Sequence, residues 1–326
     1  MDNIPILDEI KKARTLLDQY ILKTPVWNGH CPFLKGLIGS TSEVYFKLEQ
    51  LQHTGCFKIR GALLSLLNLS PEDRKKGVTT ISGGNHAIAV SYAAFLLGIS
   101  AVVFLPKTVS PMRIKKCKEY GATIHLAENV SEAFNQCIKF SNSTGIPLIH
   151  PFEGKLITLG TATLGVEFHE TVNSLNAIVV ACGGGGLLSG VSLATKLLSP
   201  QCKVYAVEPE GADAMCRSLE QGNVIRLPTI KTIADSLGAP MTEPYSLGIC
   251  QKYVDKCVRV SDEQIIEAMR YLYSELKMAI EPAGATALAG LLYPLRKELY
   301  NQRIGILICG SNIDIDLFHK YTSFIA

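Results

Sequence analysis

The chain has 326 residues, of which 47% are hydrophobic and 19% are charged. This composition excludes an intrinsically disordered protein, which combines low hydrophobicity with high net charge. The formal net charge of +3, from 32 basic and 29 acidic residues, provides no electrostatic basis for binding nucleic acid. The length is sufficient for two lobes, each with its own core.

Strand and helix patterns alternate along the chain. In chain order, the hydrophobic periodicity predicts a helix over residues 6–22, a strand over 44–48, a helix over 57–67, a strand over 79–81, a helix over 87–97, a strand over 101–105, a helix over 113–120, a strand over 123–126, a helix over 131–141, a strand over 177–181, a helix over 187–198, a strand over 203–207, helices over 262–276 and 283–292, and a strand over 304–308. Such alternation predicts an α/β protein with two lobes, each an open, mostly parallel sheet with helices on both faces.

One uncharged stretch, residues 87–105, approaches the length of a membrane span. Gly98 divides this stretch into a helix and a β-branched strand, so a buried helix followed by a buried strand explains it better. The N-terminal segment carries Asp2 and Asp8 where a secretion signal has a basic cluster. We therefore expect a cytoplasmic protein without membrane contact.

Ten cysteines could indicate disulfide bonds or a metal site. No two of them have the CxxC spacing, and the seven histidines form no HExxH motif. We therefore predict reduced thiols, most of which serve as small buried hydrophobic groups.

Ligands of open α/β sheets bind beyond the carboxyl ends of the strands, and the first unusual cluster contains Lys58. It falls in the first turn of a predicted helix, within the segment HTGCFKIRGA. The positive end of the helix dipole disfavours an ammonium there, and a neutral lysine is a nucleophile that can form a Schiff base. Taken alone, Lys58 is explained more simply as a solvated surface lysine.

Three further clusters follow predicted strands. Residues 82–86, SGGNH, lead into a helix whose free N–H groups suit a carboxylate or hydroxyl, although an ordinary capped turn fits equally well. Residues 183–186 are four glycines that can wrap a phosphate at a helix N-terminus. They form neither GxGxxG nor a GK[ST] motif. Residues 309–312, CGSN, would by themselves be a plain turn.

In this order along the chain, the four clusters resemble those of the fold-type II pyridoxal-phosphate enzymes. They are most similar to the branch of serine/threonine dehydratases and serine racemases. The segment EPAGA at residues 281–285 also matches this branch. The resemblance covers essentially the whole chain and implies a fold like that of the tryptophan synthase β subunit. It implies a large cofactor-binding domain from residues 1–50 and 152–326, a small domain from 51–151, and an active site between them.

The resemblance also implies roles for individual residues. Lys58 would bind pyridoxal 5'-phosphate as a Schiff base and later act as the base at the substrate Cα. Phe57 would pack beside the cofactor ring, and Asn85 would hydrogen-bond its hydroxyl group. Cys309 would face the pyridine nitrogen. The phosphate would be bound by backbone N–H groups of Gly183, Gly184, Gly185 and Gly186.

The substrate carboxylate would lie, by the same resemblance, against the loop that contains Ser82, Gly83, Asn85 and His86. Ser236, where relatives have a glycine, would narrow the pocket near the ring. Relatives bind a cation through a glutamate and an aspartate. Here Glu208 is a weak candidate, because Ala214 stands at the second carboxylate position. We expect no tightly bound divalent cation, and we expect a homodimer.

The reaction expected from this site is β-elimination. A neutral thiol at Cys309 cannot keep the pyridine nitrogen protonated, so the ring is a poorer electron sink and early loss of a β leaving group is favoured. The expected substrate is a small β-hydroxy amino acid such as L-threonine or L-serine, converted to a 2-oxo acid and ammonia.

Several alternatives stay open. The chain could be a lyase for another β-substituted amino acid, a catalytically silent protein that binds the cofactor, or an NAD-dependent or nucleotide-binding protein. A serine racemase is the nearest enzymatic alternative. Racemases of this family place a second acid/base serine where this chain has Gly83, so we expect weak or absent racemisation.

Overall fold

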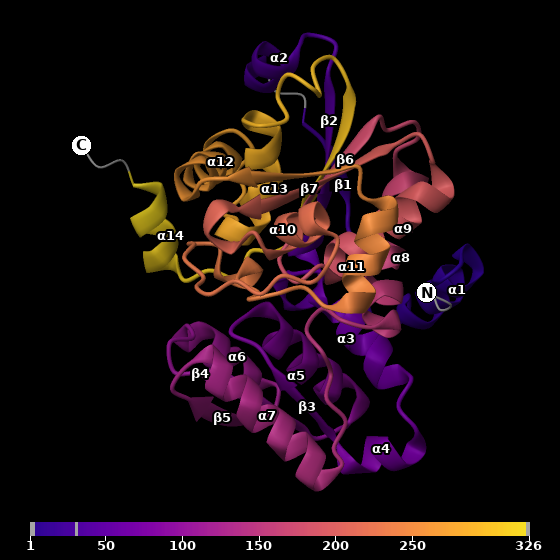
Figure 1. The fold of residues 1–326 in the computed structure, drawn as a ribbon, viewed down its shortest axis with the longest axis vertical. Helices are drawn as coiled ribbons and strands as arrows, with labels where there is room; N and C mark the ends of the chain where they lie inside the picture. The colour runs from indigo at the N-terminus through magenta and orange to yellow at the C-terminus, as the bar shows by residue number, and fades with distance from the viewer. Residues whose placement is uncertain (1–3, 30–31, 324–326) are drawn as a thin grey trace.

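The computed structural model describes residues 4–29 and 32–323 (Figure 1). The larger sheet has six strands in the order β1-β2-β9-β6-β7-β8. Strand β1 is antiparallel to β2, whereas the other neighbouring pairs are parallel. The strands are β1 (Val26–Asn28), β2 (Glu43–Leu48), β6 (Ala177–Ala181), β7 (Lys203–Pro209), β8 (Lys256–Val260) and β9 (Arg303–Ile308).

Helices cover both faces of this sheet, because its central strands are apolar on both sides. In β6 all five residues are buried. Val179 packs into a core with helices α12 (Asp262–Ser274) and α13 (Pro282–Leu292). Its neighbours Ile178 and Val180 point the other way, into a core with α8 (Lys155–Thr171) and α9 (Gly186–Leu198). This alternation is the period of a strand buried on two faces.

The smaller sheet lies in the lower part of Figure 1 and consists of the parallel strands β3 (Val78–Ile81), β4 (Ala101–Pro106) and β5 (Thr123–Ala127). Helix α5 (Asn85–Leu97) shares a core with Val103 and Leu105 of β4. Helix α7 (Val130–Thr144) covers the opposite face, where Phe104 points. The sequence prediction of an α/β fold with two mostly parallel sheets is therefore confirmed.

Eight further α-helices lie within the described residues. They are α1 (Leu7–Leu17), α2 (Pro32–Ile38), α3 (Lys58–Leu67), α4 (Pro71–Lys76), α6 (Pro111–Glu119), α10 (Ala214–Gln221), α11 (Pro244–Tyr253) and α14 (Ile315–Thr322). The first predicted helix, residues 6–22, ends earlier, at Leu17. The domain boundaries proposed above stay a prediction.

Helix α8 is the longest element that the sequence pattern did not predict. Its residues are buried almost continuously from Ile157 to His169, so it presents no apolar stripe opposite a polar face. Its glycines and threonines also weaken the helical propensity. Strands β1 and β8 and helices α2, α4, α10, α11 and α14 were missed as well.

One prediction about the cysteines is wrong: Cys216 and Cys257 form a disulfide bond. They are 41 positions apart in sequence, so no local motif announces the pair. The pairing of β7 with β8 brings Cys257 beside the segment that follows β7, where Cys216 lies in α10. Of the other cysteines, seven within the described part of the chain are buried free thiols, as expected, and Cys31 lies outside the described residues.

The uncharged stretch at residues 87–105 is divided between α5 and β4, as predicted. Within the described ranges, no helix combines the length and the apolar character that crossing a membrane requires.

Candidate active site

A pocket lies where the carboxyl ends of β6 and β9 approach the first turns of α3 and α5. All eight predicted cofactor residues line this pocket, together with residues that the sequence did not single out. The lining includes Phe57, Lys58, Asn85, Phe152, Gly183, Gly184, Gly185, Gly186, Ser236, Leu237, Glu281, Ala283 and Cys309.

Lys58 is the first residue of α3 and points its amine into the pocket. Its Nζ donates a hydrogen bond of 2.7 Å to the carbonyl oxygen of Pro151. Enclosure by the protein lowers the pKa of Lys58 to about 8, although Cys56, Cys309 and Glu281 oppose this shift. The neutral, nucleophilic fraction of this amine near physiological pH is therefore much larger than that of an exposed lysine.

The four glycines between β6 and α9 leave no room for side chains. A Cβ on Gly183 would lie 2.8 Å from the Leu237 carbonyl oxygen, and one on Gly184 only 2.3 Å from the Phe152 ring. Gly185 has φ +103°, which a larger residue adopts only with strain. Because α9 begins at Gly186, its first N–H groups stand at the pocket wall. The segment, hereafter the glycine cradle, is built to accept an anion such as a phosphate.

Asn85 is held from two sides by hydrogen bonds. Its Nδ2 donates to Glu281 Oε1 at 2.6 Å. Its Oδ1 accepts from Asn312 Nδ2 at 2.7 Å. Glu281 begins the EPAGA segment and is fully enclosed, and this burial raises the pKa of its carboxyl to about 7, with Arg113 acting in the opposite direction. The sequence comparison singled out this segment but assigned Glu281 no role.

Arg113 joins several loops next to the pocket, and its Nη2 lies 3.5 Å from Oε2 of Glu281 in the pocket lining. From α6, its Nη1 donates to the carbonyl oxygen of Gly83 at 3.1 Å, and its Nη2 donates to that of Asn312 at 3.1 Å. The same guanidinium forms an ion pair with Asp235. It thereby connects the loop after β3 with the segments after β7 and β9. No local motif marks Arg113, so sequence reasoning missed it.

Cys309 follows β9, and its Sγ lies 3.5 Å from the carbonyl oxygen of Ala283. Burial raises the pKa of this thiol well above its ordinary value, so the group stays neutral. One pocket thus combines a partly buried amine, a cradle for an anion, a fixed amide and a neutral thiol, and these groups fit pyridoxal phosphate.

The predicted substrate residues are less uniformly placed. Asn85 lines the pocket, whereas Ser82, Gly83 and His86 are not among its lining residues. Ser82 Oγ accepts the Gly84 N–H at 3.0 Å, which shapes the loop. The His86 ring lies 3.1 Å from the Ile149 carbonyl oxygen, and burial lowers its pKa to about 3, so the ring is neutral. The substrate role of these three residues stays a prediction.

Glu208, the weak cation candidate, lies outside the pocket. It is fully buried, and its carboxylate accepts backbone N–H groups from Met215 at 3.1 Å and Cys216 at 2.7 Å. Asp213 is committed elsewhere, because its two oxygens contact Arg217 and Arg259 at 2.8 Å each.

Comparison with known proteins extends these observations. The sequence pattern of the family described as "Pyridoxal-phosphate dependent enzyme" matches residues 17–310. The chain is 47% identical over 318 residues to phenylserine dehydratase of Ralstonia pickettii, covering 98% of this chain and 96% of that protein. It is 35% identical to L-threonine ammonia-lyase of Thermotoga maritima, covering 96% and 77% of the two chains. The structure of maize serine racemase superposes with a TM-score of 0.92 at 34% identity, covering 98% and 97%.

Proposed function

The chain belongs to the family of pyridoxal-phosphate dependent enzymes, and from this we propose that it is an ammonia-lyase for a β-hydroxy amino acid. The products would be a 2-oxo acid and ammonia. The observation that carries the proposal is the pocket that combines the Lys58 amine with the glycine cradle, Asn85 and the neutral Cys309 thiol.

The cofactor, when bound, withdraws electrons from the substrate Cα and makes its proton acidic. Lys58 is the base that we assign to this proton, because its lowered pKa leaves the amine free to accept it near neutral pH. The glycine cradle would hold the phosphate end, and Asn85 would orient the ring through an amide that Glu281 and Asn312 fix in place. Cys309 supplies no negative charge opposite the ring, which favours departure of the β-hydroxyl group over long-lived charge on the ring.

For the β-substituent, an aromatic ring is the candidate that we favour over the hydrogen of serine or the methyl of threonine. The support is that the relative that is 47% identical is named phenylserine dehydratase. L-Threonine and L-serine stay as alternatives, as does a racemase. The expected homodimer and cytoplasmic location stay predictions.

The test is to purify the protein with cofactor, record the visible absorbance of lysine-bound pyridoxal phosphate, and assay L-threo-phenylserine, L-threonine and L-serine for 2-oxo acid and ammonia. We expect turnover with the phenyl substrate preferred. Lys58→Ala should abolish the visible absorbance band and lower the activity at least about 1,000-fold. The exposed Lys115→Ala is the matched control and should retain both.

Two results would contradict the proposal in different ways. A protein with the band but no 2-oxo acid from any β-hydroxy amino acid is a silent cofactor-binding protein. A protein that acquires no band after addition of cofactor does not use the pocket as described.

A further inference from the structure

Glu208, Cys216 and Cys257 form a compact cluster beside the glycine cradle, outside the residues that line the catalytic pocket. The sequence predicts no tightly bound divalent cation; we propose instead that, when the Cys216–Cys257 disulfide is reduced, these three side chains bind a thiophilic divalent cation such as Zn²⁺. The disulfide and the bound cation would then be mutually exclusive states of one site, here called the Cys₂Glu site.

The distances suit such an ion. The Sγ atoms and a carboxylate oxygen all lie within 4.8 Å of one another. Cys257 Sγ lies 3.9 Å from Glu208 Oε2. Tetrahedral zinc, with Zn–S of about 2.3 Å and Zn–O of about 2.1 Å, requires an S···O separation of about 3.6 Å. Small side-chain rotations, and separation of the two sulfurs after reduction, would complete three protein ligands and leave a fourth position for water.

The carboxylate is already oriented for this role. Both oxygens of Glu208 accept backbone N–H groups at the start of α10, from Met215 and Cys216. Such hydrogen bonds fix a ligand in position before a metal arrives. Cys216 is buried, whereas Cys257 on strand β8 is only partly buried, which gives a route to solvent for an ion or a reductant.

The ligand chemistry selects the class of ion. Thiolates favour zinc and other thiophilic metals, whereas Mg²⁺ and Ca²⁺ prefer oxygen ligands. A second carboxylate is not supplied by Asp213, which is paired with Arg217 and Arg259. Arg259 stands two positions after Cys257 on the same strand, and its guanidinium also pairs with Glu220. With both thiols ionised, the three ligands carry a charge of −3, which a divalent cation offsets in large part.

Conversion of the disulfide to the two thiols requires only a small-molecule dithiol as the reductant. The dithiol transfers two electrons and two protons to the disulfide, so that the S–S bond breaks, two S–H bonds form, and the dithiol becomes a cyclic disulfide. Binding of the cation then releases the two thiol protons to solvent. Oxidation by a small-molecule disulfide reverses the sequence and expels the ion.

The location connects this site to the cofactor cradle. Met215, the neighbour of Cys216, packs against Gly185, where a Cβ would lie 2.5 Å from Met215 Cε. Cys182, directly before the cradle, donates its backbone N–H at 2.8 Å to the carbonyl oxygen of Val207, the neighbour of Glu208.

The experiment uses the holoenzyme, stripped of metals with a chelator and prepared in disulfide and dithiol forms. Each form is incubated with Zn²⁺ or Mg²⁺, separated from free ions, and analysed for metal per chain. We expect one Zn²⁺ per chain in the reduced form, none in the oxidised form, and no retained Mg²⁺ in either. Cd²⁺ added to the reduced form should produce the ultraviolet charge-transfer absorbance of cadmium thiolate.

Variants locate the ion. Cys216→Ser combined with Cys257→Ser should lose at least about 100-fold in Zn²⁺ affinity, and Glu208→Gln about 10- to 100-fold. Cys202→Ser, which removes a buried free thiol elsewhere, is the matched control and should bind zinc normally. If the double variant does not fold, the test is the cadmium-thiolate absorbance of the wild-type protein, compared between its reduced and oxidised forms. Absorbance in the reduced form alone supports the proposal, and equal absorbance in both forms contradicts it. Equal zinc retention by the two forms, or by wild type and the double variant, overturns the proposal.

Discussion

At the scale of single residues, the surroundings of Lys58 change the pKa of its amine and so its reactivity. A solvated lysine has a pKa near 10.4, whereas the walls of the pocket lower the pKa of Lys58 to about 8. Its contact with the Pro151 carbonyl holds the amine toward the pocket. The lowered pKa means that protonation is disfavoured by the folded protein, so the reactive neutral form gains population as the pH rises through about 8.

A pH dependence follows from this shift. Capture of pyridoxal phosphate by the apoenzyme requires the neutral Lys58 amine, so the capture rate should rise with pH and level off above about pH 8 to 9. Stopped-flow absorbance after mixing apoenzyme with cofactor measures this rate. A midpoint at the ordinary lysine value, about 10.4, would show that the pocket does not shift the pKa.

Gly83 provides a second prediction at this scale. Racemisation requires a second acid/base group on the far face of the substrate, and glycine has no side chain to provide it. Because Pro106 Cγ would be the nearest neighbour of an added Cβ, at 3.8 Å, a serine fits without displacement. Gly83→Ser should therefore raise the rate of L- to D-serine conversion at least about tenfold, measured by chiral chromatography.

The control for that experiment is Gly83→Ala, which adds the Cβ without a hydroxyl group and should produce no gain. A Gly83→Ser variant that retains the cofactor absorbance but converts no more L-serine than the wild type would argue against this role of the position.

At the scale of elements, the connection from β6 to α9 is where we propose that the cofactor phosphate binds. Close packing of Phe152 on the glycine backbone makes the cradle rigid, since the carbonyl oxygen of Phe152 lies 2.6 Å from where a Cβ of Gly186 would stand. Rigid donors need little reorganisation when an anion arrives. The N–H groups at the start of α9 are thus available to an anion because no side chain of the glycine cradle covers them.

Substitution in this connection should affect cofactor binding more than folding. In Gly184→Ala the added Cβ would meet the Phe152 ring at 2.3 Å, so the ring or the cradle must move. We expect the cofactor dissociation constant to rise at least about tenfold, which corresponds to about 1.4 kcal/mol, in a fluorescence titration of the apoenzyme. Gly36→Ala in α2, where nothing lies within 4 Å, is the control and should leave the affinity unchanged.

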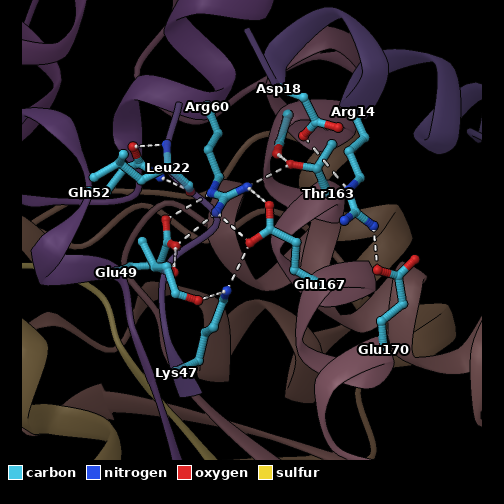
Figure 2. A network of polar contacts seen from close by, with 12 residues as sticks. Arg14, Asp18, Leu22, Lys47, Glu49, Gln52, Arg60, Thr163, Glu167 and Glu170 are labelled. Carbon is cyan, nitrogen blue, oxygen red and sulfur yellow. Dashed lines mark hydrogen bonds and ion pairs between the residues drawn. The ribbon is translucent and has the colours of Figure 1, made fainter. Parts of the chain in front are cut away.

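At the scale of the whole molecule, a buried ionic network joins distant segments (Figure 2). Arg60 of α3, two positions after Lys58, contacts Glu49 and Glu167, each at 2.8 Å. Lys47 of β2 contacts Glu167 at 2.8 Å and donates to the Thr24 carbonyl oxygen at 2.7 Å. The network ties α3 to β2 and α8 across the boundary that the sequence predicts between the two domains.

Loss of one charge from this network should be costly, because its partners are fully buried. Glu167→Gln removes a negative charge that compensates the buried cations Arg60 and Lys47. We therefore expect the free energy of unfolding to fall by about 3–5 kcal/mol. Urea denaturation measures the change. Lys116→Ala, which removes the exposed pair with Glu119, should be neutral by comparison. Equal effects of the two substitutions would mean that the network contributes no more than a surface pair.

Much of the fold and part of the site could be predicted from the sequence. The strand at residues 177–181 agrees with β6, and the glycines after it form the cradle, because a continuous apolar run and a glycine cluster are local signals. Lys58, Asn85 and Cys309 were predicted at the same site and do line one pocket. Helix α8 was not predicted, because burial on all sides removes the hydrophobic periodicity from which a helix is predicted.

The sequence by itself determined the α/β class, the order of the strands and helices that it did predict, and the residues that stand at the ends of those strands. Only the tertiary structure placed Glu281 against Asn85, Arg113 against the Gly83 and Asn312 carbonyl groups, and Cys216 beside Cys257. The physical reason is the distance along the chain over which each kind of interaction acts. Periodicity and backbone preferences act over a few neighbouring residues, whereas these contacts join segments that meet only when parallel strands pair and their helices pack.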